Sequence, residues 1–174
     1  MTLEIPRPSE GDIVDLILTD HRLFEDLLRE LRDVTSDRRR VVATMAELLV
    51  AHGEAEESKV YPSLEKKDAI DDDEVEHGAK EHDEGYQTLL PLLESAAVDT
   101  EEFSDAIHEF SETLLHHLDE EERDILNPAR TDVGDDDRAR LGAAWATERN
   151  RLLDEGCGSV DDVRRLVREA EERS

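Results

Sequence analysis

The stretch His52-Gly53-Glu54-Ala55-Glu56-Glu57-Ser58-Lys59-Val60-Tyr61-Pro62 continues the apolar stripe of a helix into side chains that carry charge. The residues before it have the three- and four-residue spacing of the buried face of an amphipathic helix. They are Val41, Met45, Leu48 and Leu49. The same spacing carries the stripe onto His52, Glu56 and Val60. An imidazole and a carboxylate therefore stand one turn apart at positions where the pattern predicts leucine.

A second run repeats this arrangement further along the chain. Its stripe passes through Leu114, His117, Glu121 and Ile125, and Pro128 follows. In both runs a glutamate comes four residues after a histidine, which is about 40° around a helix and therefore on the same face. Two such runs in one chain indicate a shared site rather than coincidence.

Hydrophobic periodicity predicts four long helices and demands no strand. Ser9 with Asp12 can cap the first helix. The second is expected to start near Ser36 and to run to about Lys66. The acidic run 71–74 makes a favourable N-terminus for the third, by capping and by the helix dipole.

Prolines and capping residues set the remaining boundaries. Pro91 is expected to kink or shorten the third helix. Asp99 and Glu102 have capping-box spacing for the fourth helix, which Pro128 is expected to close.

Four amphipathic helices with short connections predict an all-α fold, an antiparallel up-down four-helix bundle, over residues 10–130. Residues 131–174 contain two shorter helical patterns, which we interpret as a C-terminal appendage packed on the bundle. Gly156 and Gly158 end the first of these patterns, and Ser159 begins the second. Neither pattern contains a histidine.

The charge balance excludes some classes of partner. The chain has 48 acidic and 21 basic residues and a formal net charge of −27, which argues against nucleic acid and against anionic membrane surfaces. Lysine occurs at only four positions, and an acidic, lysine-poor surface resembles proteins of halophilic microbes, where salt screens self-repulsion. The charge therefore indicates habitat more than function.

A single cysteine, Cys157, allows no intrachain disulfide and no thiolate metal cluster, and we expect it to have no role. Residues 1–10 contain no apolar signal segment, and no window approaches the roughly 20 apolar residues of a membrane span. We expect a reduced, cytoplasmic protein of 174 residues with one main domain.

Each of the four predicted helices places one histidine on its buried stripe, and two add a carboxylate. The six candidate metal ligands are His21, His52, Glu56, His82, His117 and Glu121. Burying an ionised carboxylate without a partner costs several kcal/mol, and no lysine or arginine shares these stripes. A pair of cations bridged by the two carboxylates would remove that cost. Imidazole and carboxylate ligands without sulfur suit iron, manganese or zinc, and two bridging carboxylates favour two iron ions.

The ordered set His21, His52-x-x-x-Glu56, Glu81-His82 and His117-x-x-x-Glu121 resembles the hemerythrin-like (HHE cation-binding) family over about residues 12–128. The resemblance implies a non-haem di-iron centre with an oxo or hydroxo bridge. Glu56 and Glu121 would be bridging ligands, the four histidines would be terminal ligands, and an open iron position would take O₂ or a related small molecule.

Two departures separate the chain from the oxygen-carrying hemerythrins. Those proteins have a second histidine one turn before His82, where this chain has Gly78; His77 is about 140° away around the helix. In those proteins the last carboxylate is an aspartate five residues after its histidine, whereas Glu121 follows His117 by four. The set is more similar to the iron-sensing and iron-centre-repair branches.

We therefore predict a binding protein, and not an enzyme, that senses, binds or handles O₂, NO or iron; its protein partner is undefined. One alternative is a di-iron enzyme that detoxifies peroxide or NO or repairs iron-sulfur centres. Another is a metal-free helical interaction module.

For several polar residues near the stripes, the sequence leaves two structural roles open. His116 and His108 are expected at the surface, whereas His77 is either a surface residue or an extra ligand. Asp20 either holds a ligand histidine by a hydrogen bond or faces solvent. The same choice applies to Glu57 and Glu122, and neither is expected to be a ligand; for Tyr61 and Tyr86, core packing is favoured over lining a ligand pocket.

Overall fold

The computed structural model describes residues 3–174, and within that range the chain forms helices and no strand. The all-α prediction is confirmed. The helices are α1 (Ile13–Arg32), α2 (Arg38–Ala55), α3 (Tyr61–Lys66), α4 (Asp72–Glu94), α5 (Glu101–Glu121), α6 (Asn127–Asp132), α7 (Asp135–Glu155) and α8 (Val160–Arg173). Two π-helical turns, η1 (Glu56–Val60) and η2 (Glu122–Leu126), join α2 to α3 and α5 to α6.

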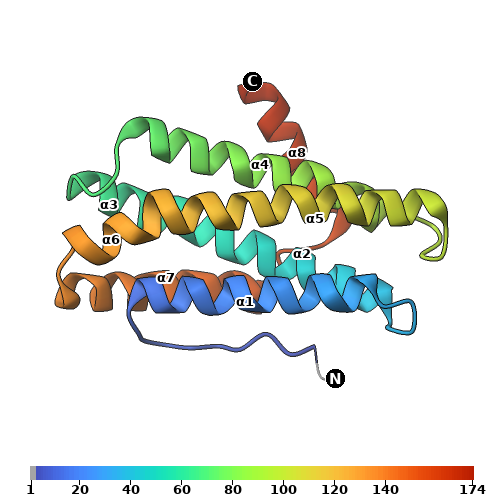
Figure 1. Cartoon of the computed structure of the whole chain (residues 1–174), viewed down its shortest axis with the longest axis horizontal. Coiled ribbons are helices and arrows are strands. Elements are labelled where there is room, and N and C mark those ends of the chain that lie inside the picture. The colour runs from blue at the N-terminus through green and yellow to red at the C-terminus, as the bar shows by residue number, and fades with distance from the viewer. Residues whose placement is uncertain (1–2) are drawn as a thin grey trace.

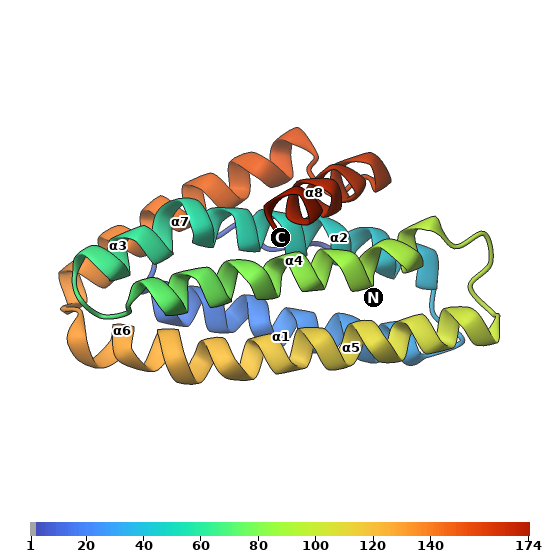
Figure 2. The same ribbon diagram turned by 90° about the horizontal axis from the view of Figure 1, so that it is seen from above.

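Four long helices lie side by side with alternating directions (Figure 1). α1 contacts α2 and α5, and α4 contacts the same two helices, so the four close a ring. α7 packs along α1 and α2, and α8 packs against α4 on the same outer side of the bundle (Figure 2). No helix in residues 3–174 has both the length and the apolar character needed to cross a membrane.

Two separate apolar clusters form the core. Phe24 and Leu28 of α1 belong to one cluster, and Ile13 and Ile17 belong to the other. Asp20 and His21 lie between these two sets along α1, and both are buried. A polar layer therefore divides the apolar core, with apolar side chains on either side of it along the bundle.

The helix starts follow the predicted capping chemistry with two corrections. The Asp12 side chain caps α1 by accepting a hydrogen bond from the Val14 amide, and Ser9 takes no part. The Thr100 hydroxyl, rather than Asp99, caps α5 by accepting from Phe103, because Thr100 is the residue directly before the first helical turn. α4 begins within the acidic run 71–74 and α8 begins after Ser159, as predicted, and in both the start is a capping box.

The two prolines within the predicted helices interrupt them less than the sequence predicts. α4 continues through Pro91 and ends at Glu94, within one turn. Pro128 does not end the helical segment, because it lies in the first turn of α6, directly after a π-helical turn. The chain therefore stays helical to Asp132.

Each π-helical turn ends two residues before a proline; η1 begins at the buried Glu56, and η2 begins directly after the buried Glu121. The Tyr61 amide donates to the Glu56 carbonyl, and the Asn127 amide donates to the Glu122 carbonyl, five residues back in both cases. A proline at the next position can neither donate to the carbonyl four residues back nor fit beside it. One extra residue in the turn relieves that conflict. The sequence repeat is therefore also a repeat of backbone shape, and such turns are frequent at functional sites.

Candidate metal centre

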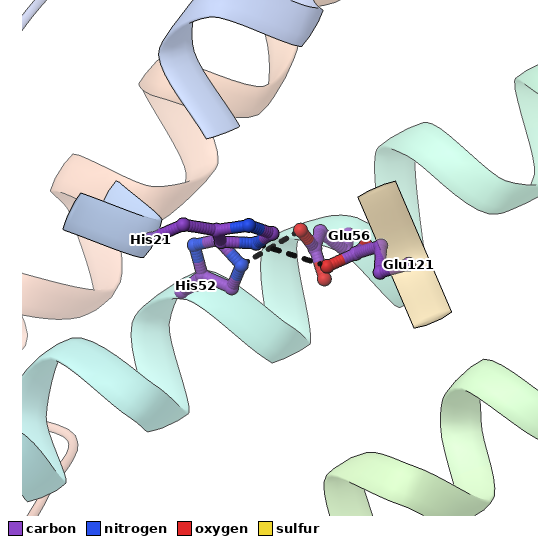
Figure 3. Close-up of side chains that lie close together, drawn as sticks. All are labelled: His21, His52, Glu56 and Glu121. Atoms are coloured by element: carbon purple, nitrogen blue, oxygen red, sulfur yellow. Dashed lines mark hydrogen bonds and ion pairs between the residues drawn. The ribbon is translucent and has the colours of Figure 1, made fainter. Parts of the chain in front are cut away.

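The structure brings all six predicted ligand residues together in the buried polar layer. One group consists of His21, His52, Glu56 and Glu121, and a second consists of Glu56, His82 and His117. In each group one donor atom per residue lies within 4.8 Å of all the others. Figure 3 shows the imidazoles of His21 and His52 pointing at the carboxylates of Glu56 and Glu121.

Glu56 connects the two groups, because its two oxygens contact histidines of different helices. Its Oε1 lies 2.7 Å from His52 Nε2 on α2, and its Oε2 lies 3.0 Å from His82 Nε2 on α4. A carboxylate that faces two imidazoles with separate oxygens has the geometry of a bridge between two sites.

Glu121 occupies the matching position on α5. Its Oε2 lies 3.1 Å from His21 Nε2 and 3.6 Å from His117 Nε2. The site is therefore two histidine pairs, one from α1 and α2 and one from α4 and α5, with two carboxylates between them. The repeated sequence motif supplies one histidine and one carboxylate from α2 with η1 and one of each from α5.

The second ring nitrogen of every histidine faces another carboxylate. These contacts are His21 Nδ1 to Glu122 at 2.9 Å, His52 Nδ1 to Asp20 at 3.0 Å, His82 Nδ1 to Glu57 at 2.9 Å and His117 Nδ1 to Glu81 at 3.4 Å. A carboxylate that accepts from Nδ1–H leaves the lone pair on Nε2, which points inward. For Asp20, Glu57 and Glu122 the structure favours a hydrogen-bonding role over solvation.

Asp20 is held in turn by an arginine that sequence analysis did not single out. Arg149 of α7 has no exposed surface, and its Nε and Nη2 donate to the two oxygens of Asp20 at 2.7 and 2.8 Å. Trp145, one turn earlier on α7, packs edge-on against His52. The signal was present in the sequence, because Arg149 falls four residues after Trp145 on the apolar stripe of α7.

Tyr61 lies in the centre of the site, where core packing had been favoured. Its hydroxyl donates to Glu121 Oε1 at 2.9 Å and also lies 3.3 Å from Glu56 Oε2. Its ring is nearly parallel to that of His82, with centroids 5.8 Å apart. The missing side chain of Gly78 makes this possible, because a Cβ there would lie 2.9 Å from the Tyr61 ring.

Without a cation, neighbouring carboxylates favour the protonated form of His52 and His82. Burial lowers the pKa of His52, but Glu56 and Asp20 outweigh it and raise that pKa to about 10. Burial also opposes protonation of His82, whose pKa Glu56 and Glu57 nevertheless raise well above its ordinary value. In residues 3–174 no lysine or arginine pairs with Glu56 or Glu121.

The residues fit a bound metal. His52 Nε2, Glu56 Oε1 and His117 Nε2 are buried, and none of them makes a hydrogen bond of acceptable geometry, although His52 Nε2 and Glu56 Oε1 are only 2.7 Å apart. Unsatisfied buried polar atoms are rare in proteins and require a partner. Four imidazole nitrogens and two carboxylates form a donor set for iron, manganese or zinc.

The remaining histidines lie outside this layer. His116 and His108 are exposed, as expected, and each pairs with a glutamate one turn later. His77 is exposed and contacts Glu120 and Glu81, not the buried ligands. Tyr86 is buried in the apolar cluster, and Cys157 lies in the same cluster, so both have packing roles.

Comparison with known proteins agrees with this geometry. The family model for the hemerythrin HHE cation binding domain matches residues 12–129, which span α1 to α6. Curated proteins gave no match, and solved structures gave none. The matched range is most of the chain and contains all six candidate ligands. The chain therefore belongs to the hemerythrin HHE cation-binding family.

Proposed function

We propose that the chain holds a non-haem di-iron centre and uses it to sense, bind or handle O₂, NO or iron. The observation that carries the proposal is the position of Glu56, whose two oxygens contact histidines of two separate groups. A single metal ion would need only one of these groups. Two groups that share a carboxylate favour a pair of ions.

The side chains divide into holding and orienting roles. Glu56 and Glu121 would lie between the two ions, and the four histidines would bind one pair to each ion. The bound iron pair would supply an open position for a diatomic ligand. The outer carboxylates hold each imidazole with Nε2 inward, and the Tyr61 hydroxyl fixes the orientation of the Glu121 carboxylate.

The space beside the site favours a small ligand over an organic substrate. A cavity of about 30 Å³ borders His117, Glu121, Gly78 and Ile125. One water requires about 10–15 Å³, whereas pockets for organic ligands measure roughly 300–1,000 Å³. The cavity thus has room for a diatomic molecule, a water or a cation. This supports a binding role rather than turnover of an organic substrate.

The test is the metal content of protein purified without chelator, together with its visible spectrum in air. We expect about two irons per chain and the absorption bands of an oxo-bridged ferric pair. The Glu56→Ala, Glu121→Ala double variant should lose both. A matched control, His108→Ala with Glu112→Ala, removes an exposed histidine–glutamate pair of α5 and should lose neither.

Two other results would contradict this proposal. Failure to bind iron after anaerobic reconstitution, in a protein whose fold survives loss of Glu56 and Glu121, would leave the helical interaction module. Product formation from peroxide or NO over many turnovers would instead favour the enzyme alternative.

A further inference from the structure

A third cluster of donor atoms lies at the surface beside the buried site. His77 and Glu81 are one turn apart on α4, and Glu120 faces them from α5. His77 Nε2 lies 2.6 Å from Glu120 Oε2 and 3.4 Å from Glu81 Oε1. Neighbouring ligands of one octahedral cation with bonds of about 2.1 Å are about 3 Å apart, so the spacing suits a single divalent cation.

The cluster opens onto the cavity that reaches the buried site. His77, Glu81 and Glu120 line one part of that cavity, and His117 and Glu121 line another. His117 is 3 % exposed, and its Nε2 has no hydrogen-bond partner. Glu81 joins the two ends directly, because its Oε1 lies 3.4 Å from both His77 Nε2 and His117 Nδ1. A path of donor atoms thus runs from solvent to the buried ligands.

The electrostatic field along this path attracts cations. The cavity lining contains no lysine or arginine, and its acidic members are Glu74, Glu81, Glu120, Glu121 and Asp124. The guanidinium of Arg123 lies beside the cavity, but it pairs chiefly with Asp124 at 2.8 Å and is 3.8 Å from Glu120 Oε1. His116 also faces Glu120 Oε1, at 3.3 Å, which leaves Oε2 to His77. A cleft lined by one sign of charge concentrates the opposite ion.

We propose that His77, Glu81 and Glu120 form a surface site for a divalent cation, and that an ion bound there passes along the cavity to the buried centre. Transfer of the ion to the buried centre rests on the proposed metal-binding function, whereas binding of the ion at the surface site does not. An anion is a poor occupant, because the acidic lining repels it.

The first experiment counts bound Mn²⁺ by electron paramagnetic resonance, because the signal of free Mn²⁺ falls as the ion binds to protein. Iron-loaded protein should take up about one further Mn²⁺ per chain. The surface variant His77→Ala with Glu120→Gln should take up none, while the control His108→Ala with Glu112→Gln should match the parent. Uptake that is equal in the surface variant and in the parent would overturn the proposed site.

A second experiment follows the rate at which metal-free protein acquires Fe²⁺ under anaerobic conditions. Loss of the surface cluster should slow loading by about tenfold or more at low salt, because focusing raises association rates by 10–10³. The final iron content should stay unchanged. An unchanged rate would refute passage through the cluster, while a lower final content would show that its residues are part of the centre itself.

The two proposals fail separately. Comparing Mn²⁺ uptake by metal-free parent, surface variant and the Glu56→Ala, Glu121→Ala variant assigns each bound ion. If only the surface variant loses an ion, the buried centre is refuted and the surface site stands alone. If only the buried-site variant loses ions, the surface site is refuted and the proposed function stands.

Discussion

Replacing Arg149 by methionine tests whether α7 supports the candidate centre through Asp20. Methionine keeps much of the buried length of arginine but removes both hydrogen bonds to Asp20. Asp20 is 4 % exposed, so its carboxylate would be left buried with only His52 as partner. Breaking a buried ion pair on one side costs about 3–5 kcal/mol. For a protein of this size that corresponds to a fall in Tm of roughly 6–20 °C.

The assay is urea unfolding of metal-free protein, followed by circular dichroism at a fixed, moderate salt concentration. Arg149→Met alone should lower the free energy of unfolding by about 3–5 kcal/mol. Adding Asp20→Asn removes the stranded charge and should recover most of that loss, since a buried pair replaced on both sides is often close to neutral. The single change should also weaken metal binding by about 10–100-fold, because Asp20 orients His52.

Two results would refute this reasoning. A loss below about 1 kcal/mol for Arg149→Met would place it among ordinary surface substitutions and mean that solvent can replace the guanidinium. Equal losses in the single and double variants would mean that the arginine acts by packing on Trp145 and not by charge.

Three further predictions concern the polar layer. His52 has a folded-state pKa of about 10 against an ordinary value of 6.5, so its stabilisation of the metal-free protein is complete below pH 6.5 and is lost as pH rises through about 10. The midpoint of urea unfolding should therefore fall over this pH range. A midpoint that rises would contradict the prediction. Metal affinity should rise as pH rises, because binding displaces the imidazole protons. Calorimetric titration with metal at two pH values measures this change. Stronger binding at the lower pH would contradict the prediction. Tyr61→Phe leaves Glu121 without its phenol donor and should destabilise the metal-free protein by about 1–3 kcal/mol. The control Tyr86→Phe removes a hydroxyl that has no hydrogen-bond partner and should cause no such loss. Equal losses of unfolding free energy in the two variants would contradict the role of the Tyr61 hydroxyl.

The sequence was sufficient to predict which six histidine and glutamate side chains are buried together. His52 and Glu56 occupy positions of an otherwise apolar helical stripe, and His117 and Glu121 repeat the pattern. Helical periodicity alone determines that such side chains face the core. The same argument places His21 and His82 inside.

The outer part of the site depends on contacts between distant segments. Arg149 reaches Asp20 across 129 residues of sequence, and periodicity says nothing about which helices lie side by side. Tyr61 enters the centre only because Gly78, on another helix, leaves room for its ring. The π-helical turns were also missed, because a proline in a helical pattern signals a break without revealing how the backbone absorbs it.

The contact between Asp20 and Arg149 links two equilibria. Asp20 contacts the candidate ligand His52 on one side and Arg149 of α7 on the other, so packing of α7 and binding of a cation would share one carboxylate. Thermodynamic reciprocity then applies: whatever free energy the docked α7 adds to cation binding, a bound cation adds to the docking of α7. Truncation after α6 should therefore weaken cation binding although every candidate ligand remains, and a bound cation should in turn stabilise the packing of α7 on the bundle.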